Sequence, residues 1–381
     1  MQTHQWIWQN PDWPKFTYDL EQLLSRLAGL NRLIGALEIT SRTLTGEALL
    51  DAREKALTDD VLETSAIEGE LLRRSSVRAS IRKRLGLPVS QDDSDRHTDA
   101  LVAMLLDARK SAERPLTEEK FFAWHAALFP TGYSGLHKIN VGGYRGQEQM
   151  QIVSGPVEKE KVHYIAPPRN QLDADMKSLF TYINNRVKTD PLLKAGIAHF
   201  WFIMIHPFDD GNGRMARALS DYILSGQHPH LMQIVSFSKQ ISQDRKGYYH
   251  ILEKAGKGGV DITPWLTWFL DTLTNAMHES NWIIARITTK VLFWHKYKDI
   301  QFNSRQQKVL NRLLDSGEKF EGGMTTRKYA SMTKCSKVTA SRDLVDLEKK
   351  NILQKRQGGG RSTSYEIKPI APNLKTLNPV P

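Results

Sequence analysis

The stretch His206-Pro-Phe-Asp-Asp-Gly-Asn-Gly-Arg-Met-Ala-Arg217 directly follows the most apolar run of the chain, Ala198–Ile205. Such a run predicts a buried helix. Gly211 and Gly213 predict a tight loop, because glycine tolerates positive φ and allows a close backbone approach. A further helix is expected from about Asn212 to Leu224. The sequence therefore predicts two helices joined by a glycine-rich loop.

The polar residues of this loop suit phosphate chemistry. Free N–H groups at the start of a helix attract an anion. Arg214 and Arg217 lie three residues apart, so both side chains can project to the same side of the helix and form paired hydrogen bonds with phosphate oxygens. Asp210 is an oxygen ligand of the kind that Mg²⁺ prefers. His206 has an ordinary pKa near neutrality, as a general base requires, and Phe208 is expected to anchor the loop. Each residue alone has an ordinary structural explanation, but chance matches to the whole pattern should be very rare.

The pattern His-x-Phe-x-Asp-Gly-Asn-Gly-Arg-x-x-Arg resembles the signature of the Fic family, and the chain matches all of its fixed positions. The resemblance implies a mainly α-helical fold, in which a Fic helical core carries a β-hairpin flap. It also implies an enzyme that transfers AMP from ATP to Ser, Thr or Tyr hydroxyls of a target protein, the enzyme itself included, with Mg²⁺ as cofactor. The Doc type of relative transfers phosphate and departs from Gly-Asn-Gly. Gly211 and Gly213 therefore favour AMP transfer.

The resemblance also implies a role for each residue of the loop. His206 would deprotonate the target hydroxyl, Asp210 would hold Mg²⁺, and Arg214 and Arg217 would contact the β- and γ-phosphates. The expected ATP-binding residues are Glu68, His206, Gly211, Asn212, Gly213, Arg214, Met215, Ala216, Arg217, Tyr248 and Tyr249. The last two would help to hold the adenine, although a packed aromatic pair explains them equally well.

A second motif, Thr64-Ser-Ala-Ile-Glu68-Gly69, resembles the inhibitory pattern of the same family, Ser/Thr-x-x-x-Glu-Gly/Asn. Its place before the core resembles relatives that inhibit themselves from the N-terminal side. Glu68 would then pair bidentately with Arg217 and exclude the γ-phosphate. Thr64 would bridge to the loop, and Gly69 would leave room for the approach. For the motif alone, an exposed glutamate at a helix break is the alternative.

Two short β-like runs, Gln151–Ser154 and Val162–Ala166, predict a hairpin. The resemblance makes it a flap that holds an extended target segment by strand addition, and a plain surface hairpin is the equal alternative. Helices are expected at about 18–37, 45–85 with a break at 64–69, 100–111, 118–128, 172–186, 190–205, 212–224, 242–256 and 263–286.

The C-terminal part has a different pattern. It predicts a winged helix-turn-helix. The elements are an amphipathic helix at Gln306–Leu314, a helix-turn-helix within Thr325–Lys350, and two strands around a glycine-rich wing at Gln357–Ser364. Residues 301–381 hold 16 Lys and Arg against 7 Asp and Glu, a net charge of +9 out of +11 for the chain. DNA is therefore a candidate partner, and a well-solvated surface is the alternative. The expected domains are 1–98, an N-terminal module with the inhibitory motif, 99–290, the catalytic core with following helices, and 303–370, winged-helix-like.

The composition of the 381 residues, 40% hydrophobic and 25% charged, is that of a globular protein. The single cysteine, Cys335, excludes an intrachain disulfide and fits a reducing compartment. No signal peptide is evident, and Ala198–Ile205 is too short to span a bilayer. We expect a cytoplasmic protein with no membrane contact, and a homodimer remains open. Two rival functions also remain open: a nucleotide-responsive DNA-binding regulator, and a de-AMPylase in which the inhibitory glutamate aligns a water.

Overall fold

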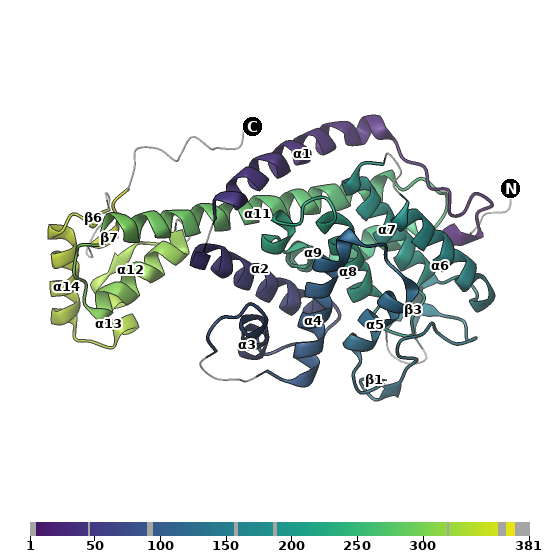
Figure 1. Cartoon of the computed structure of the whole chain (residues 1–381), viewed down its shortest axis with the longest axis horizontal. Coiled ribbons are helices and arrows are strands. Elements are labelled where there is room, and N and C mark those ends of the chain that lie inside the picture. Colours follow the sequence, from purple (N-terminus) through teal and green to yellow (C-terminus); the bar gives the residue numbers. More distant parts are fainter. Residues whose placement is uncertain are drawn as a thin grey trace. The chain divides into compact units, whose positions relative to one another are not determined.

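The computed structural model describes residues 5–44, 46–89, 94–155, 159–185, 189–317, 320–356 and 363–369. The chain is mainly helical, as predicted (Figure 1). It divides into two compact units, Met1–Asn281 and Trp282–Pro381. The finer division at 98, 290 and 303 stays a prediction. In the described part of the chain, no helix is both long enough and apolar enough to cross a membrane.

The first unit begins with helices that precede the segment around the glycine-rich loop. They are the 3-10 turn η1 (Ile7–Gln9), α1 (Leu20–Thr43), α2 (Gly46–Ile67), α3 (Arg74–Arg84), α4 (Arg96–Lys110) and the 3-10 turn η2 (Ser111–Glu113). The predicted helical stretch 45–85 is thus two helices. The break falls at the predicted place, because Gly69 has a φ of +86°, which ends a right-handed helix.

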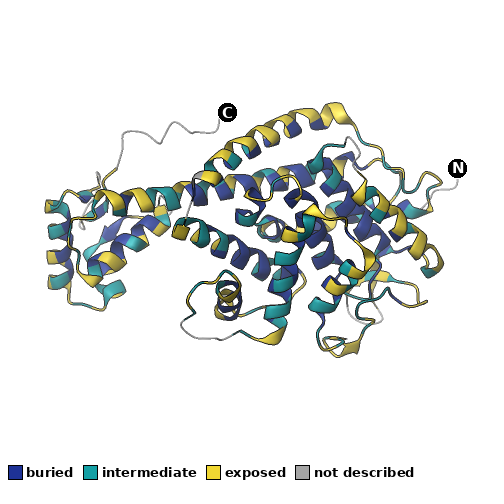
Figure 2. Ribbon diagram, in the orientation of Figure 1, coloured by how far each residue is buried: buried dark blue, intermediate teal, exposed yellow. Residues whose placement is uncertain are grey.

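The core follows with α5 (Glu118–Leu128), α6 (Arg169–Asn184), α7 (Pro191–Ile205), α8 (Asn212–Ser225), η3 (Leu231–Ile234), α9 (Phe237–Gln243), α10 (Arg245–Ala255) and α11 (Thr263–Lys296). Helix α7 starts as predicted, with an Asp190 cap and proline at its first position. Helices α7 and α8 pack against each other and are buried along most of their length (Figure 2). The predicted glycine-rich loop joins them at the centre of this core.

Two predicted helices differ from the observed ones for local reasons. The stretch 242–256 begins only at Arg245, because the Asp244 side chain accepts a hydrogen bond from the Gly247 N–H and caps a new helix, α10. Helix α11 continues past the predicted end at Arg286 to Lys296, since its apolar periodicity runs on to Phe293, a core residue of the second unit.

The strands of the first unit form two small antiparallel pairs. Strands β1 (Tyr133–Ser134) and β2 (His137–Lys138) were not predicted. Strands β3 (Gln151–Ser154) and β4 (Lys161–Ile165) form the predicted hairpin, with an irregularity between Ile152 and Val153. Residues 156–158 at its tip lie outside the described part.

The second unit contains α12 (Ser304–Ser316), β5 (Met324–Thr325), α13 (Thr326–Thr333), α14 (Lys337–Lys349), β6 (Leu353–Lys355) and β7 (Ser364–Ile367). Its strands form an antiparallel sheet in the order β5-β7-β6. The three helices and the final hairpin of this unit follow the order predicted for a winged helix-turn-helix. Strand β5, between α12 and α13, was not predicted. Residues 357–362 of the predicted wing, Gln357–Ser364, lie outside the described residues.

Candidate active site

The loop between α7 and α8 places the His206 side chain at a sharp turn. His206 follows the last residue of α7 and has a left-handed backbone, with φ 49° and ψ 61°. Its Nδ1 lies 3.2 Å from the Ile203 carbonyl oxygen. A carbonyl oxygen only accepts, so Nδ1 carries the proton and Nε2 keeps its lone pair. Burial lowers the pKa of His206 to about 4, below the near-neutral value expected from the sequence, and the imidazole is neutral at pH 7.

Apolar packing and backbone hydrogen bonds fix the loop. Phe208 is fully buried, and its ring stacks on that of His125 with centroids 3.9 Å apart. The Asn212 side chain closes the loop, since its Oδ1 accepts from the Phe208 N–H at 3.0 Å and its Nδ2 donates to the Phe208 carbonyl at 2.8 Å. His125 Nε2 lies 3.1 Å from the Asp210 carbonyl oxygen, and Nδ1 accepts from the Gly142 N–H. The sequence interpretation missed His125.

Arg145 is a second residue that the sequence interpretation missed. Its buried guanidinium donates from Nε to the His206 carbonyl at 2.9 Å and from Nη2 to the Pro167 carbonyl at 2.5 Å. Its backbone N–H donates to the Pro207 carbonyl at 2.9 Å. Arg145 therefore holds the turn on which the His206 side chain depends. The run Val141-Gly-Gly-Tyr-Arg145 carried the only signal, an arginine that follows two glycines and a tyrosine.

Arg217 lies on the buried face of α8 and contacts the end of α2. Its Nε donates to Thr64 Oγ1 at 2.7 Å, and its Nη2 donates to the Thr64 carbonyl at 3.0 Å and to Glu68 Oε1 at 2.6 Å. Burial opposes the charge, but the Glu68 carboxylate outweighs it and raises the pKa of Arg217. The sequence-predicted pair is therefore present, through one carboxylate oxygen and not in the expected bidentate form.

Arg214 is paired as well, with a residue that was not predicted. Its Nη1 lies 3.1 Å from Glu70 Oε2, and its guanidinium lies over the Phe129 ring, 4.9 Å from the centroid. Glu70 also lies 2.7 Å from His97 Nε2, and the hydrogen bond from His97 lowers the pKa of Glu70. The two arginines of the loop motif are thus paired with two glutamates on either side of Gly69.

The glycines of the site have different roles. At Gly213 a Cβ would lie 2.1 Å from Glu68 Oε1, so only glycine admits this carboxylate. At Gly69 nothing lies within 4 Å of a Cβ, and the residue is instead required by its φ of +86°. The expectation that Gly69 leaves room is therefore replaced by a backbone reason. Gly211 has a φ of +83°, and a Cβ there would meet the Phe129 ring at 2.8 Å.

A cleft of about 710 Å³ opens in front of the loop. The predicted residues that line it are Glu68, His206, Asp210, Asn212, Gly213, Tyr248 and Tyr249. Gly211, Arg214, Met215, Ala216 and Arg217 are not among its lining residues. Tyr248 is buried, with its hydroxyl 2.9 Å from His199 Nε2, whereas Tyr249 is 41% exposed, with its hydroxyl 3.4 Å from Glu68 Oε2.

Asp210 is the only predicted metal ligand. One carboxylate oxygen accepts from the Ser134 hydroxyl and the other from the Gly211 N–H at 2.5 Å. The described residues contain no group of three or more His, Cys, Asp or Glu side chains that could hold a metal ion. A single carboxylate beside a phosphate site does fit Mg²⁺, which commonly binds through one or two carboxylates plus substrate phosphates.

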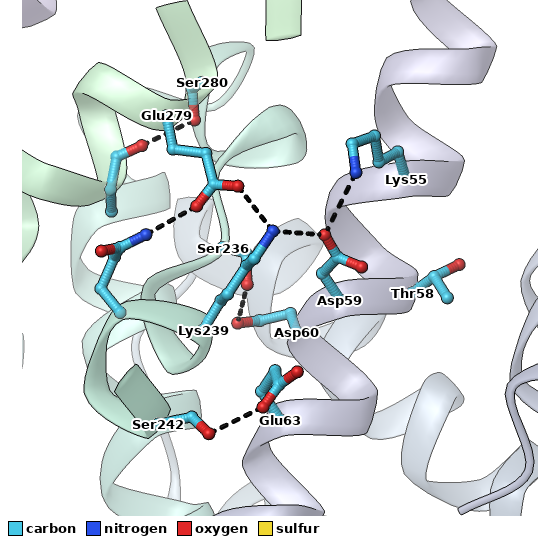
Figure 3. A network of polar contacts seen from close by, with 12 residues as sticks. Lys55, Thr58, Asp59, Asp60, Glu63, Ser236, Lys239, Ser242, Glu279 and Ser280 are labelled. Atoms are coloured by element: carbon cyan, nitrogen blue, oxygen red, sulfur yellow. Dashed lines mark hydrogen bonds and ion pairs between the residues drawn. The ribbon is translucent and has the colours of Figure 1, made fainter. Parts of the chain in front are cut away.

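A polar seam holds α2 against α9 and α11 (Figure 3). Lys239 donates to Asp59 Oδ2 at 2.9 Å and to Glu279 Oε1 at 2.5 Å. Ser236 Oγ donates to Asp60 at 3.0 Å, and Ser242 Oγ to Glu63 at 2.7 Å.

Deeper in the protein, Arg109 of α4 joins α2 to α8 through buried ion pairs. Its Nη2 lies 2.5 Å from Asp60 Oδ2 and 2.7 Å from Asp221 Oδ2. The helix that carries Thr64 and ends just before Glu68 therefore adds these charged and polar contacts to the packing of its buried apolar residues, which include Leu57, Val61 and Ile67.

Comparison with known proteins agrees with this geometry. Residues 115–224 match the model of the Fic/DOC family, and residues 6–87 match a domain of unknown function, DUF4172. "Protein adenylyltransferase Fic" of Drosophila mojavensis is 25% identical over 284 residues, 72% of this chain and 51% of that protein. Its Drosophila willistoni counterpart is 24% identical over 285 residues, 72% and 52% respectively. The chain spans about half the length of the curated relatives it matches.

Solved structures share the fold. A Fic family protein from Desulfovibrio desulfuricans superposes with a TM-score of 0.53 at 21% identity, over 91% of this chain and 95% of that one. A Fic-domain signalling protein from Bacteroides thetaiotaomicron gives 0.52 at 21% identity, over 68% and 95%. The chain therefore has the fold of Fic proteins, and the loop His206–Arg217, called the signature loop below, lies within residues 115–224, which match the Fic/DOC family model.

Proposed function

We propose that this protein is a protein adenylyltransferase that moves AMP from ATP to a hydroxyl of a protein and is inhibited by its own Glu68. One observation carries the proposal most directly. The neutral imidazole of His206 lines the same cleft as Asp210, Asn212 and Gly213, where the backbone N–H groups of α8 begin. Relatives named adenylyltransferases support the reaction.

The proposed reaction uses His206 as the general base. Because Nδ1 donates to the Ile203 carbonyl, Nε2 is free to accept the proton of a target Ser, Thr or Tyr hydroxyl. The hydroxyl oxygen then attacks the α-phosphorus of ATP and forms the new P–O bond, while the bond to the β-phosphate oxygen breaks. Pyrophosphate leaves. Arg145 fixes the carbonyl of His206 and so keeps Nε2 in position.

The start of α8 would bind the phosphates. Its first N–H groups, at Asn212 and Gly213, have no partner within the helix and favour negative charge. The N–H of Gly211, which donates to Asp210 here, would join them once the Asp210 carboxylate turns to the metal ion. Arg214 and Arg217 would contact the β- and γ-phosphates once released from the glutamates. Asp210 would hold Mg²⁺, which when bound offsets charge on the phosphates.

The β3–β4 hairpin would present the target. It forms a two-stranded sheet among the described residues, so one edge of β3 has no neighbouring strand. A target segment could pair with that edge and bring its hydroxyl to the cleft. Tyr249, half-exposed at the cleft, would border the adenine, whereas Tyr248 would support it from behind.

Glu68 would inhibit by occupying Arg217. The pair is 2.6 Å long, and Arg217 is almost fully buried, so a γ-phosphate can reach this guanidinium only after Glu68 leaves. We add Glu70 as a second inhibitory residue, because it holds Arg214 in the same way. In the reverse reaction, removal of AMP from a protein, Glu68 would align a water, and a label chase distinguishes the two.

A second candidate function, DNA binding by the C-terminal unit, is favoured by the charge pattern of α14. Lys337 and Arg342 on this helix have no ionic partner among the residues that the structure describes, whereas Asp343, Asp346 and Glu348 are each paired. The second helix of a helix-turn-helix enters the major groove. The unit would thus present free positive charge where DNA would bind. A cytoplasmic location fits both functions.

The test of the main proposal uses purified full-length protein, a whole-cell lysate heated beforehand to inactivate its own kinases, and ATP labelled at either phosphate. Glu68→Gly with α-labelled ATP should label proteins, and γ-labelled ATP should not, since pyrophosphate carries the γ-phosphate away. A chase with unlabelled ATP should leave the label in place. Label from γ-labelled ATP would indicate a kinase instead, and rapid loss on the chase would favour de-AMPylation.

A further inference from the structure

A hydroxyl and an imidazole of the flap are joined by hydrogen bonds to a carboxylate of the neighbouring helix α10. Ser154 Oγ of β3 lies 2.6 Å from His163 Nε2 of β4, and His163 Nδ1 lies 2.8 Å from Glu253 Oε2 of α10. The residues come from three different elements. All three line the 710 Å³ cleft that also contains His206 and the start of α8.

The hydrogen-bond acceptor at the end of the series Ser154–His163–Glu253 decides which nitrogen of His163 carries the proton. Lys257 Nζ donates to the other oxygen of Glu253 at 2.6 Å. This bond and the one from His163 lower the pKa of Glu253 to about 2, so the carboxylate is ionised and accepts. His163 therefore carries its proton on Nδ1, and Nε2 accepts the hydrogen bond of the Ser154 hydroxyl. This is the arrangement that activates a serine as a nucleophile.

Hydrolysis by this group would need more than the three residues. A serine hydrolase also requires donors placed for an oxyanion, which these three side chains do not themselves supply. An electrophile is nevertheless supplied nearby. On the proposed function, the α-phosphate of ATP lies in the same cleft, already in contact with the donors of the signature loop.

We propose that Ser154 is an internal AMP acceptor, a modification site on the flap that His163 and Glu253 activate. The inference rests on the proposed adenylyl transfer. Ser154 Oγ attacks the α-phosphorus, its proton passes to His163 Nε2, and the bond to the β-phosphate oxygen breaks. The products are a serine–AMP phosphodiester and pyrophosphate. AMP on Ser154 would occupy the cleft and the strand edge of β3, so modification limits further transfer to targets.

The positions of the tryptic cleavage sites allow AMP on Ser154 to be located by mass spectrometry. Between Arg145 and Lys159, Ser154 is the only Ser, Thr or Tyr, so the tryptic peptide 146–159 reports on this one hydroxyl. Full-length Glu68→Gly is incubated with ATP, and AMP on this peptide is quantified by mass spectrometry. We expect the modified fraction at a given time to be independent of protein concentration, because the acceptor belongs to the same molecule.

Variants in the Glu68→Gly background separate activation from simple docking of the flap. Ser154→Ala should remove AMP from the peptide, and His163→Gln should lower it by about a hundredfold or more, the usual contribution of a general base. Lys161→Gln is the matched control, since Lys161 pairs with the same Glu253 at 3.9 Å but takes no part in the hydrogen-bonded chain. It should retain the modification.

The outcomes are distinct. AMP on other peptides with none on 146–159 would overturn the Ser154 proposal and leave the adenylyltransferase intact. AMP on no protein at all would contradict the proposed function itself. Equal losses in Lys161→Gln and His163→Gln would show that Glu253 only docks the flap.

Discussion

The signature loop and the end of α2 face the same cleft, but different interactions hold them. Phe208, Asn212 and Arg145 fix the loop through packing and hydrogen bonds to the backbone. The end of α2 is buried through Ile67, and the residues just after it form ion pairs, from Glu68 to Arg217 and from Glu70 to Arg214. Packing is insensitive to salt and ligand charge, whereas an ion pair competes directly with a phosphate. On the proposed function, the difference separates a rigid part that catalyses the transfer from a displaceable part that inhibits it.

The largest effect should come from the rigid part. His206→Ala in the Glu68→Gly background should lower AMP transfer by about 10²–10⁴-fold, because the base is lost. ATP affinity, measured by calorimetry, should change little, since the phosphate-binding groups remain. Transfer at near-parent rates would exclude His206 as the base.

Releasing the inhibitory part should have the next largest effect. Glu68→Gly should raise AMP transfer by about 5–150-fold, the usual range of a regulatory coupling, and should lower the KM for ATP. Arg217→Ala should cancel the gain, since the released guanidinium is what binds the γ-phosphate. Equal rates for wild type and Glu68→Gly across a range of ATP concentrations would contradict autoinhibition.

Glu70 should contribute less than Glu68, because its side chain is 36% exposed against 26% for Glu68. Glu70→Gln added to Glu68→Gly should raise transfer by a further factor of about two to five, as expected for a solvent-screened pair of up to about 1 kcal/mol. Glu70→Gln alone should have little effect, since Glu68 still blocks Arg217. A fall in the rate of the double variant would instead make Glu70 a residue that orients Arg214 for ATP.

The next prediction concerns the polar seam between α2 and α9, and asks whether its ion pairs help to hold α2 in place. Lys239→Met removes the pairs with Asp59 and Glu279 and should destabilise the fold by about 1–3 kcal/mol, between the values for exposed and buried pairs. The melting temperature should fall by about 2–4 °C per kcal/mol, and basal AMP transfer should rise a few-fold. Lys177→Met, at an exposed site on α6, is the control. A lower melting temperature without any rise in transfer would show that the seam serves stability only.

The smallest effect on transfer should come from the C-terminal unit. Substitutions test this unit better than a truncation near Asn303, which would uncover Phe293 of its core. Arg342→Ala with Lys337→Ala should leave transfer within about twofold and weaken binding of a duplex DNA in fluorescence anisotropy, with a shallower salt dependence. Unchanged DNA affinity at every salt concentration would remove this second function.

Much of the fold was predictable because its signals are local. Helix α5 has the predicted bounds, with Thr117 as its cap, and the α7 start follows from Asp190-Pro191. The errors have local causes too: Asp244 restarts a helix, and α11 continues because its apolar face continues to Phe293. Residues 133–138 carry no alternating pattern, so β1 and β2 gave no signal.

The residues of the candidate site also fall into two groups, those that the sequence alone indicates and those that only the structure reveals. By itself, the sequence determined the signature loop and the Thr64–Gly69 motif, because both depend on residue types at short fixed spacings. It could not find His125, Arg145 or Glu70, whose partners in the loop and in α8 are 61 to 144 residues away along the chain. Only the tertiary structure decided that the two loop arginines are both paired, and that Ser154, His163 and Glu253 meet. Contacts between distant segments depend on how helices pack, and no local pattern of residues records that packing.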